Sequence, residues 1–265
     1  MPDKPETRTN HANGYKKLTI LSFLVILMAW CALSYSGAVK EVFLPTPGAV
    51  LRDFWAMHQE GILLSYTLAS TYRVMVGWFL AVVAAVPLGM LIGTSKAAEA
   101  LFEPAIDFAR YLPVVAMVPL TLLYFGIGDL QKFVIIFLGT FFQLVLMVSD
   151  VAANVPRDLL RAAATLGANK WQTYRLVLMP ASLPGIMDSL RITVGWAWTY
   201  LVVAELVAAN SGLGYMILRA QRFLAIERIF AGLVIIGLLG LLTDYFFKWL
   251  TNLVVPWSEK AGGKA

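Results

Sequence analysis

The segment Pro156–Pro180, PRDLLRAAATLGANKWQTYRLVLMP, is the longest polar interruption after the first third of a chain that is otherwise mostly hydrophobic. Leu and Ala, both strong helix formers, fill its first half, and Gly167 follows where a helix end needs a left-handed residue. Asn169 and Gln172 have the spacing of a capping box that starts a second helix. Pro180 is predicted to stop that helix. The sequence therefore predicts a loop of two short helices.

The composition is that of a membrane protein. Of the 265 residues, 59% are hydrophobic and only 14% are charged, and the mean hydropathy is +0.73. Soluble domains carry about 25% charged residues. The net charge of +5 does not indicate nucleic-acid binding, because the basic residues are scattered between apolar runs. Cys31 is the only cysteine, and His11 and His58 are distant from each other, so neither a disulfide nor a metal site is expected.

Apolar runs long enough to cross a bilayer recur along the chain and predict an all-α membrane protein with about six transmembrane helices. We expect a transmembrane domain over residues 18–255, preceded by a disordered polar tail over 1–17 and followed by a polar tail over 256–265. The first apolar run is interpreted as a retained helix and not as a signal peptide. The predicted spans are Leu18–Tyr35, Tyr72–Ile92, Tyr111–Gly128, Phe133–Val148, Pro184–Ala208 and Ile229–Phe247.

The basic residues predict the orientation of these spans, since Lys and Arg are enriched in cytoplasmic loops. With the amino terminus in the cytoplasm, fourteen of the 21 Lys and Arg residues fall inside or at the inner interface. The same orientation puts residues 156–180 in the cytoplasm. The outer segment 219–222, with Arg at both ends, is more basic than the rule expects.

The polar loop resembles the EAA signature of the permease subunits of bacterial ABC importers, which reads Glu-Ala-Ala, three residues, Gly, nine residues and Ile-x-Leu-Pro. Arg161-Ala162-Ala163, Gly167 and Val177-x-Met179-Pro180 occupy the corresponding positions. In that family the signature forms the coupling helices that dock on the ATPase subunit. Val177 and Met179 are conservative replacements. Arg161 stands where the family usually has Glu, so the ion pair that this Glu would make with the ATPase is not implied here.

Two further stretches are similar to the permeases of the nitrate, sulfonate, taurine and bicarbonate group. Leu44-Pro-Thr-Pro-Gly-Ala-Val50 resembles their Leu-Pro-Ser-Pro-x-x-Val, within a segment Lys40–Tyr66 that we predict as a loop with an amphipathic portion. Gly212-Leu-Gly214 follows a fifth span that contains Trp-x-Tyr and Ala-Glu-Leu-Val, as in that group. The resemblance covers Leu44–Trp249 and implies the type I importer permease fold.

The resemblance also implies an assembly of two permease chains, expected as a homodimer, with two ATPase subunits and a periplasmic binding protein in a bacterial inner membrane. The solute would be a small oxyanion or organic anion. The chain has no Gly-x-x-x-x-Gly-Lys-Ser/Thr loop, so ATP and Mg²⁺ are expected on the ATPase and no cofactor or metal on this chain. The predicted docking surface is Ala162, Ala163, Leu166 and Gly167, with a rim of Arg161, Lys170, Trp171 and Arg175, followed by Val177, Met179 and Pro180.

Some residues inside the spans are candidates for a gate or pathway. Pro113 and Pro119 free backbone carbonyls in the third span, although a packing kink explains them equally well. Glu205 lies near the outer end of the fifth span, after Trp198, where a carboxylate is costly. It is predicted either to pair with an arginine of 219–222 in an outer gate or to lie at headgroup level. The candidates are Glu205, Pro113, Pro119 and Trp198.

Other classes of membrane protein remain as alternatives. A secondary transporter would carry its own coupling site near the membrane midplane and often an internal repeat. The sequence shows no convincing repeat and no deeply central acid. A membrane-embedded enzyme would need clustered His, Cys or paired carboxylates, and none is apparent. A channel-like protein is the remaining alternative, and it would not need an ATPase.

Overall fold

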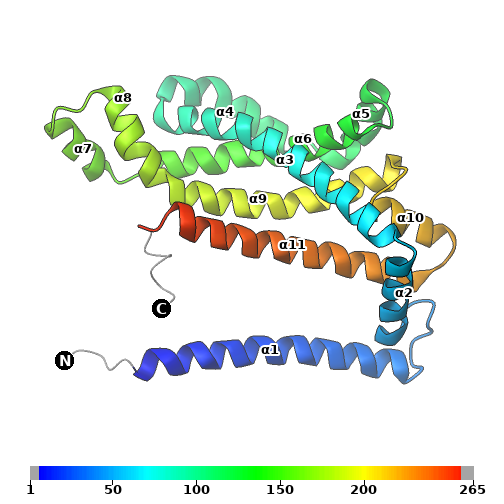
Figure 1. Ribbon diagram of the computed structural model, residues 1–265. Helices are drawn as coiled ribbons and strands as arrows, with labels where there is room; N and C mark the ends of the chain where they lie inside the picture. Colours follow the sequence, from blue (N-terminus) through cyan, green and yellow to red (C-terminus); the bar gives the residue numbers. More distant parts are fainter. Residues whose placement is uncertain (1–5, 258–265) are drawn as a thin grey trace. The chain divides into compact units, whose positions relative to one another are not determined.

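The computed structural model describes the backbone of residues 6–257, and every regular element in that range is a helix (Figure 1). Among these residues, five helices are long and apolar enough to span a membrane, or six if one bent pair counts as a single span. The chain divides into two compact units, Met1–Leu63 with Arg219–Ala231 and Leu64–Leu218 with Gly232–Ala265. The long helices are α1 (Glu6–Tyr35), α3 (Ile62–Thr94), α6 (Asp129–Ala153), α9 (Met179–Ala208) and α11 (Ile226–Val254).

The start of α1 differs from the prediction of a disordered tail over 1–17. The apolar span itself is Leu18–Tyr35, as predicted, but the helix already begins at Glu6. Extending an existing helix adds one hydrogen bond for each residue fixed, which is far less costly than nucleating a new helix. The polar residues 6–17 therefore continue the helix. Residues 1–5 and 258–265 lie outside the described residues.

The segment Lys40–Tyr66 contains a defined helix, α2 (Pro47–Gln59), where the sequence predicted mainly a loop. The Thr46 side chain accepts a hydrogen bond from the Ala49 amide at 3.2 Å, and Pro47 occupies the first turn. A hydroxyl cap followed by proline is a strong helix start. The Leu-Pro-Thr-Pro-Gly-Ala-Val motif is therefore the beginning of a helix. Within the same unit, Arg228 forms an ion pair with Asp53 at 2.9 Å.

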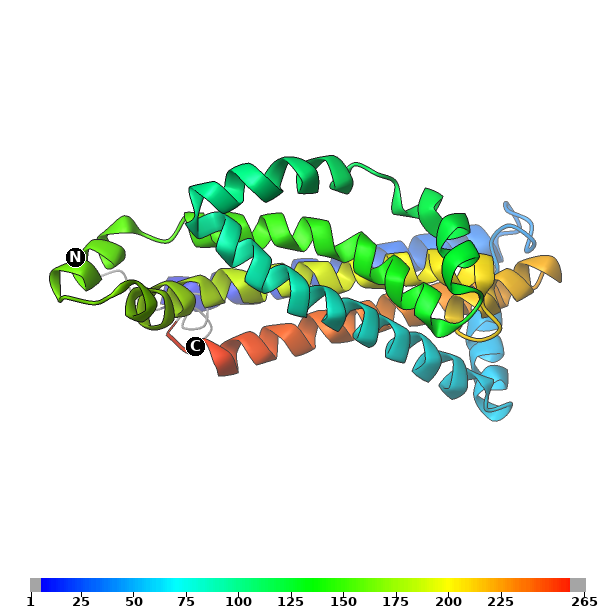
Figure 2. The same ribbon diagram turned by 90° about the horizontal axis from the view of Figure 1, so that it is seen from above.

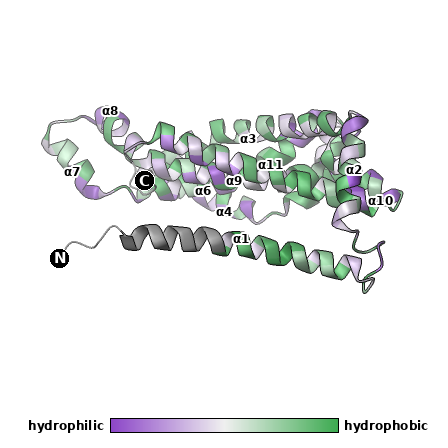
Figure 3. Ribbon diagram, turned by 60° about the horizontal axis from the view of Figure 1, so that its bottom comes forward, coloured by the Kyte–Doolittle hydropathy of each residue, from purple (hydrophilic) through white to green (hydrophobic). Residues whose placement is uncertain are grey.

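The larger unit is held together by close packing of α3, α6 and α9. Helices α6 and α9 lie side by side in both views (Figures 1 and 2). Gly89 lies so close to α6 that a Cβ there would be 2.6 Å from the Val145 carbonyl oxygen, so the missing side chain allows the two helices to pack closely. Trp78 Nε1 on α3 donates to Thr193 Oγ1 on α9 at 3.2 Å. Hydropathy follows the elements: the long helices are mostly apolar, and hydrophilic residues gather at α8 (Lys170–Thr173) and α10 (Leu213–Arg222) (Figure 3).

The third predicted span, Tyr111–Gly128, is not a single helix. It contains a 3₁₀ turn, η1 (Val114–Met117), and the short helix α5 (Val118–Phe125). Together these two elements are bent by 84° from the preceding helix α4 (Lys96–Arg110). Pro113 precedes η1 and Pro119 lies in the first turn of α5, where the missing N–H is tolerated. The two prolines therefore mark a break between helices. Helix α4 was not predicted, because its apolar residues occupy only one face and do not form a continuous apolar run.

The other predicted spans lie inside longer helices of the structure. Tyr72–Ile92 falls within α3, Phe133–Val148 within α6, Pro184–Ala208 within α9 and Ile229–Phe247 within α11. The predicted spans are shorter than the helices because hydropathy identifies only the apolar stretch of a helix and not the turns that continue it at either end.

Candidate functional site

The polar loop of residues 156–180 contains the break that its glycine predicts. Helix α7 (Arg157–Thr165) ends two residues before Gly167, whose φ of +78° lies in the left-handed region. The Gly167 amide donates to the Ala164 carbonyl and the Ala168 amide to the Ala163 carbonyl, both at 3.0 Å. This pair of bonds is a Schellman motif. It satisfies two carbonyls at the helix end and reverses the chain sharply.

The second helix of the loop begins with the predicted capping box. The Asn169 side chain accepts from the Gln172 amide at 2.9 Å, and the Gln172 side chain accepts from the Asn169 amide, also at 2.9 Å. Two otherwise free amides of α8 are thereby bonded. Local side-chain chemistry alone accounts for this part of the loop.

Pro180 does not stop the second helix, and that prediction was wrong. Between α8 and α9 the chain forms a π-helical segment, η2 (Tyr174–Leu178), in which the Met179 amide donates to the Tyr174 carbonyl. In a regular α-helix the ring of Pro180 would press on the carbonyl of Leu176. The wider π turn accommodates the ring. Residues Lys170–Val207 therefore form one helical stretch of membrane-spanning length.

The loop exposes large apolar side chains. Leu166 is 88% exposed and Trp171 is 66% exposed, and the Trp171 ring stacks on Tyr174. Exposed apolar groups on a polar segment are typical of a contact surface for another protein. Ala163, by contrast, is only 6% exposed and faces its own chain. We therefore remove Ala163 from the expected docking surface, because a partner could not reach its side chain.

The remaining loop residues differ in exposure. Arg161, at the position where the family usually has Glu, forms a 3.4 Å ion pair with Asp158, and both side chains are highly exposed. Such a pair contributes little to stability. Ala162, Gly167, Lys170, Arg175 and Met179 are exposed, while Val177 and Pro180 are half-buried.

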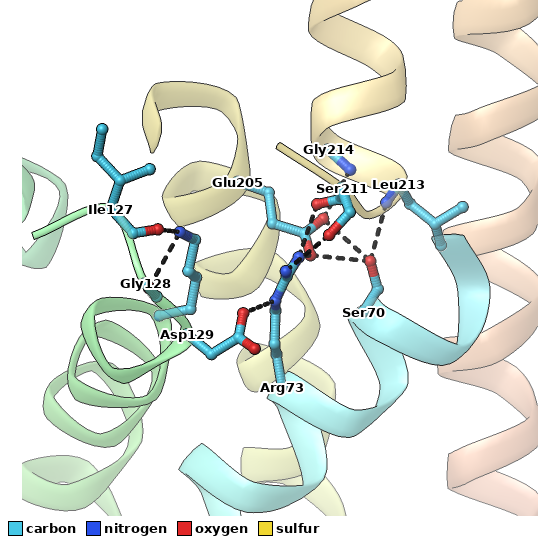
Figure 4. Close-up of polar contacts among 10 residues, drawn as sticks. Ser70, Arg73, Ile127, Gly128, Asp129, Glu205, Ser211, Leu213 and Gly214 are labelled. Carbon is cyan, nitrogen blue, oxygen red and sulfur yellow. Dashed lines mark hydrogen bonds and ion pairs between the residues drawn. The ribbon is translucent and has the colours of Figure 1, made fainter. Parts of the chain in front are cut away.

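A buried charged cluster lies in the larger unit, near the other end of α9 (Figure 4). The Glu205 side chain is fully buried, and Arg73 Nη1 on α3 donates to its Oε1 at 2.7 Å. Arg73 Nε also forms an ion pair with Asp129, the first residue of α6, at 2.7 Å. The Arg73 guanidinium thereby connects α3, α6 and α9.

The turn after α9 folds around the same carboxylate. Gly214 donates its amide to Glu205 Oε2 at 2.8 Å, and Ser70 Oγ donates to both carboxylate oxygens at 3.0 Å. Gly212 has a φ of +108°, and a Cβ at this position would overlap the Glu205 carboxylate. Arg73 completes the enclosure by donating to the Ser211 carbonyl at 2.7 Å. The Gly-Leu-Gly motif therefore forms a turn that encloses the Glu205 carboxylate and binds it through a backbone amide.

Lys132 adds a second buried cation beside this cluster. Its residue exposure is 1%, and Nζ donates to the carbonyls of Ile127 at 2.6 Å and Gly128 at 3.1 Å. The formal charges of Arg73, Lys132, Asp129 and Glu205 cancel. Balanced and hydrogen-bonded charges are the form in which ionised groups persist in a protein interior.

The structure corrects the predicted surroundings of Glu205. Its ion-pair partner is Arg73 and not an arginine of 219–222, and the side chain is fully buried within the protein. Sequence reasoning missed this pair because the two residues are 132 positions apart. The only available signal was that both are ionisable residues near the outer ends of predicted spans.

The other pathway candidates lie in different environments. Trp198 is 3% exposed within a cluster that includes Val74 and Leu201, and in the described part of the chain its Nε1 has no hydrogen-bond partner. A cavity of about 460 Å³ lies between the break after α4, the middle of α6 and α9. Pro113 lines this cavity, whereas Pro119, Trp198 and Glu205 do not.

Among the described residues, no group of three or more His, Cys, Asp or Glu could hold a metal.

Comparison with known proteins identifies the family. Residues 85–256 match the family described as "Binding-protein-dependent transport system inner membrane component". A probable ABC transporter permease protein of Brucella abortus (strain 2308) is 38% identical over 92% of this chain and 96% of its own length. The taurine transport system permease protein TauC of Escherichia coli is 32% identical over 91% of this chain and 89% of its own.

A solved structure agrees with the fold. The inward-facing MetNI methionine ABC transporter, in its native crystal form, contains a chain that matches with a TM-score of 0.66 at 22% identity, covering 74% of this chain and 97% of its own. The family match and the relatives confirm the resemblance inferred from the polar loop, and the structural match confirms the predicted permease fold. The relatives are transporter subunits and not enzymes. The chain belongs to the family of binding-protein-dependent ABC transporter permeases, the membrane-spanning components of these transport systems.

Proposed function

We propose that the chain forms the translocation pathway of an ATP-driven importer for a small anion that a periplasmic binding protein delivers. Relatives are named for aliphatic sulfonates in Bacillus subtilis, at 33% identity, and for nitrate in Synechocystis, also at 33%. ATP and Mg²⁺ would be bound by a separate ATPase subunit. The observation that carries the proposal is the exposure of Leu166 and Trp171 on a two-helix loop that runs directly into a spanning helix.

The docking surface for the ATPase consists of Ala162, Leu166 and Gly167. Leu166 supplies the apolar anchor, since it is the most exposed large side chain of the loop. Truncating a central apolar anchor typically costs an interface far more than changing its rim. The rim consists of Arg161, Lys170, Trp171 and Arg175, and Val177, Met179 and Pro180 form the junction with α9.

Continuity of the helix provides the mechanical connection. Movement of the ATPase would displace the loop, and the uninterrupted helix Lys170–Val207 would carry that displacement along α9. At its other end, Glu205 links α9 to α3 through Arg73, and Arg73 in turn contacts Asp129 of α6. We therefore assign Glu205 to a structural tie that makes the three helices move together. Its carboxylate accepts hydrogen bonds from three protein donors, Ser70, Arg73 and Gly214, so it does not serve as a solute ligand.

The proposed assembly contains two copies of this permease, two ATPase subunits and the binding protein. The amino terminus and the loop 156–180 face the cytoplasm of a bacterial cell, as the basic residues predict. Residues 18–255 form the transmembrane domain in the inner membrane, and the many exposed apolar side chains of α1, α3 and α11 contact lipid or the second copy.

A pull-down tests this proposal. The tagged permease is extracted from its native host in mild detergent, and co-purifying proteins are identified by mass spectrometry. We expect an ABC ATPase to co-purify with the native chain and with Leu166→Met, and to be lost with Leu166→Glu, because a carboxylate would replace the apolar anchor. Purification of the native chain without an ATPase would contradict the proposal and favour a secondary transporter or a channel.

A further inference from the structure

The 460 Å³ cavity beside the broken helix has the composition of a ligand site. Its walls come from the end of α4 and the turn after it, from α6 and from α9, all in the larger unit. Cavities of this size hold small organic ligands, with mostly apolar walls and a few directed polar groups. Arg110, Gln143 and Thr199 are among its polar lining residues, one from each element.

Two nitrogens of the Arg110 guanidinium have partners in the protein, and the third has none in the described residues. Its Nε forms an ion pair with Asp107 at 3.0 Å, and Nη2 donates to the Tyr111 hydroxyl at 3.0 Å. Its carbon lies 4.7 Å from the centre of the Tyr111 ring. Within the described chain, Nη1 has no hydrogen-bond partner. A guanidinium that is fixed on one side and open on the other presents donors suited to carboxylate or sulfonate oxygens.

Gln143 and Thr199 provide further donors across the cavity. Neither side chain makes a hydrogen bond within the described residues, and both line the cavity. The Gln143 amide and the Thr199 hydroxyl each offer hydrogen atoms to an oxyanion. The guanidinium, the amide and the hydroxyl line the same cavity, and each has a donor that is available to an anionic head group.

Aromatic walls define the rest of the cavity. Phe142 on α6 and Trp196 and Tyr200 on α9 line it. Tyr200 packs directly on Gly139, where any Cβ would overlap the ring, so the glycine fixes the position of this wall. A small inorganic oxyanion would contact the polar groups but leave the apolar walls facing water, whereas an apolar tail on the anion would cover them.

We propose that this cavity is a solute-binding site for organic monoanions, with Arg110, Gln143 and Thr199 holding a sulfonate or carboxylate and the aromatic residues contacting its apolar body. The inference rests on the proposed function, and it narrows the class of transported solute from small anions in general to organic anions. Arg110 is the only charged residue among those that line the cavity, and Asp107 already pairs with its Nε, so the site suits a ligand with no more than one negative charge.

Cysteine labelling tests the site without requiring transport. Cys31 is the only cysteine, so Thr199→Cys in a Cys31→Ser chain places one thiol in the cavity. We expect pentanesulfonate to slow maleimide labelling of this thiol, and nitrate to do so far less. Leu166→Cys, on the exposed loop, serves as the control that neither anion protects. Equal protection by nitrate, or none by pentanesulfonate, would overturn the proposal.

Arginine variants separate this inference from the proposed function. Arg110→Gln should abolish the protection and lower ATP-driven pentanesulfonate uptake about tenfold or more, with Arg110→Lys intermediate. Arg52→Gln, which removes an exposed charge elsewhere, should leave both unchanged, and all three variants should co-purify with the ATPase. Uptake by Arg110→Gln equal to that of Arg52→Gln would refute the site while leaving the permease assignment intact. If the native chain purified without an ATPase, the permease assignment would be refuted. The labelling experiment would still show whether the cavity binds an organic anion.

Discussion

Arg73 Nη1 on α3 lies 2.7 Å from Glu205 Oε1 on α9, and neither side chain is more than 7% exposed. Removing water from two charges is costly, and their attraction compensates only when the remaining polar atoms are also bonded. Here Ser70, Ser211 and Gly214 supply those bonds. This ion pair therefore fixes the relative position of two helices. Replacing one of its two side chains should destabilise the fold more, for each residue changed, than replacing both.

The first prediction follows from that asymmetry. Arg73→Met leaves the Glu205 carboxylate buried without its arginine and should lower the free energy of unfolding by about 3–5 kcal/mol. Glu205→Met should lower it by less, because Arg73 still pairs with Asp129. The double variant should lose clearly less than the sum of the two losses. Thermal unfolding of the purified chain in detergent measures all three. Additive losses would show that the two side chains do not stabilise the fold as a pair.

The second prediction concerns the turn around the carboxylate. Gly212→Ala should destabilise the chain, because the methyl group would overlap Glu205 and the positive φ disfavours any side chain. Gly237→Ala on α11 is the matched control, since nothing lies within 4 Å of its Cβ position and alanine favours a helix. We expect a lower melting temperature for Gly212→Ala alone. Equal melting temperatures would contradict the account of the Gly-Leu-Gly motif.

The third prediction concerns the turn in the docking loop. Gly167→Val should uncouple ATP hydrolysis from uptake, because a β-branched residue cannot adopt its left-handed conformation without strain of about 1–2 kcal/mol. Membrane insertion should remain normal, since the change is confined to an exposed loop. Gly167→Asn should retain coupling, because asparagine tolerates this conformation. Normal ATP-driven uptake by Gly167→Val would contradict the assigned role of the turn.

A fourth prediction concerns Pro180 and the π turn before it. Pro180→Ala restores an amide and removes the ring, so a regular α-helix becomes available through Tyr174–Leu178. Closing the π turn would rotate the docking loop about the axis of α9. We therefore expect more ATP hydrolysed for each solute imported, without a lower melting temperature. An unchanged ratio would mean that the π turn has no role in coupling.

Local chemistry explains which parts of the loop could be predicted from sequence. The capping box joins Asn169 to Gln172, three residues away, and the bonds around Gly167 stay within five residues. Interactions of that range are encoded by the neighbouring residues. The continuation of the helix past Pro180 was not predictable in the same way. A proline can end a helix, or the helix can continue if a wider π turn makes room for the proline ring.

Long-range contacts were beyond sequence reasoning. Glu205 was recognised as unusual, but nothing in the pattern selected Arg73 over the arginines of 219–222, which are closer in sequence. The break at Pro113 was visible as a proline, yet its 84° angle depends on the amphipathic helix α4, which hydropathy does not reveal. Arg110 drew no attention because it directly precedes the predicted span Tyr111–Gly128, where a flanking arginine is ordinary.

Reconstituted transport tests the central claim most directly. Proteoliposomes contain the permease with its co-purified ATPase, ATP is enclosed on the side of the docking loop, and the binding protein with labelled solute is supplied on the other side. We predict uptake that requires ATP, the ATPase and the binding protein together, and that is lost with Leu166→Glu. Uptake by the permease without the ATPase would contradict the account and identify the chain as a transporter with its own energy coupling or as a channel.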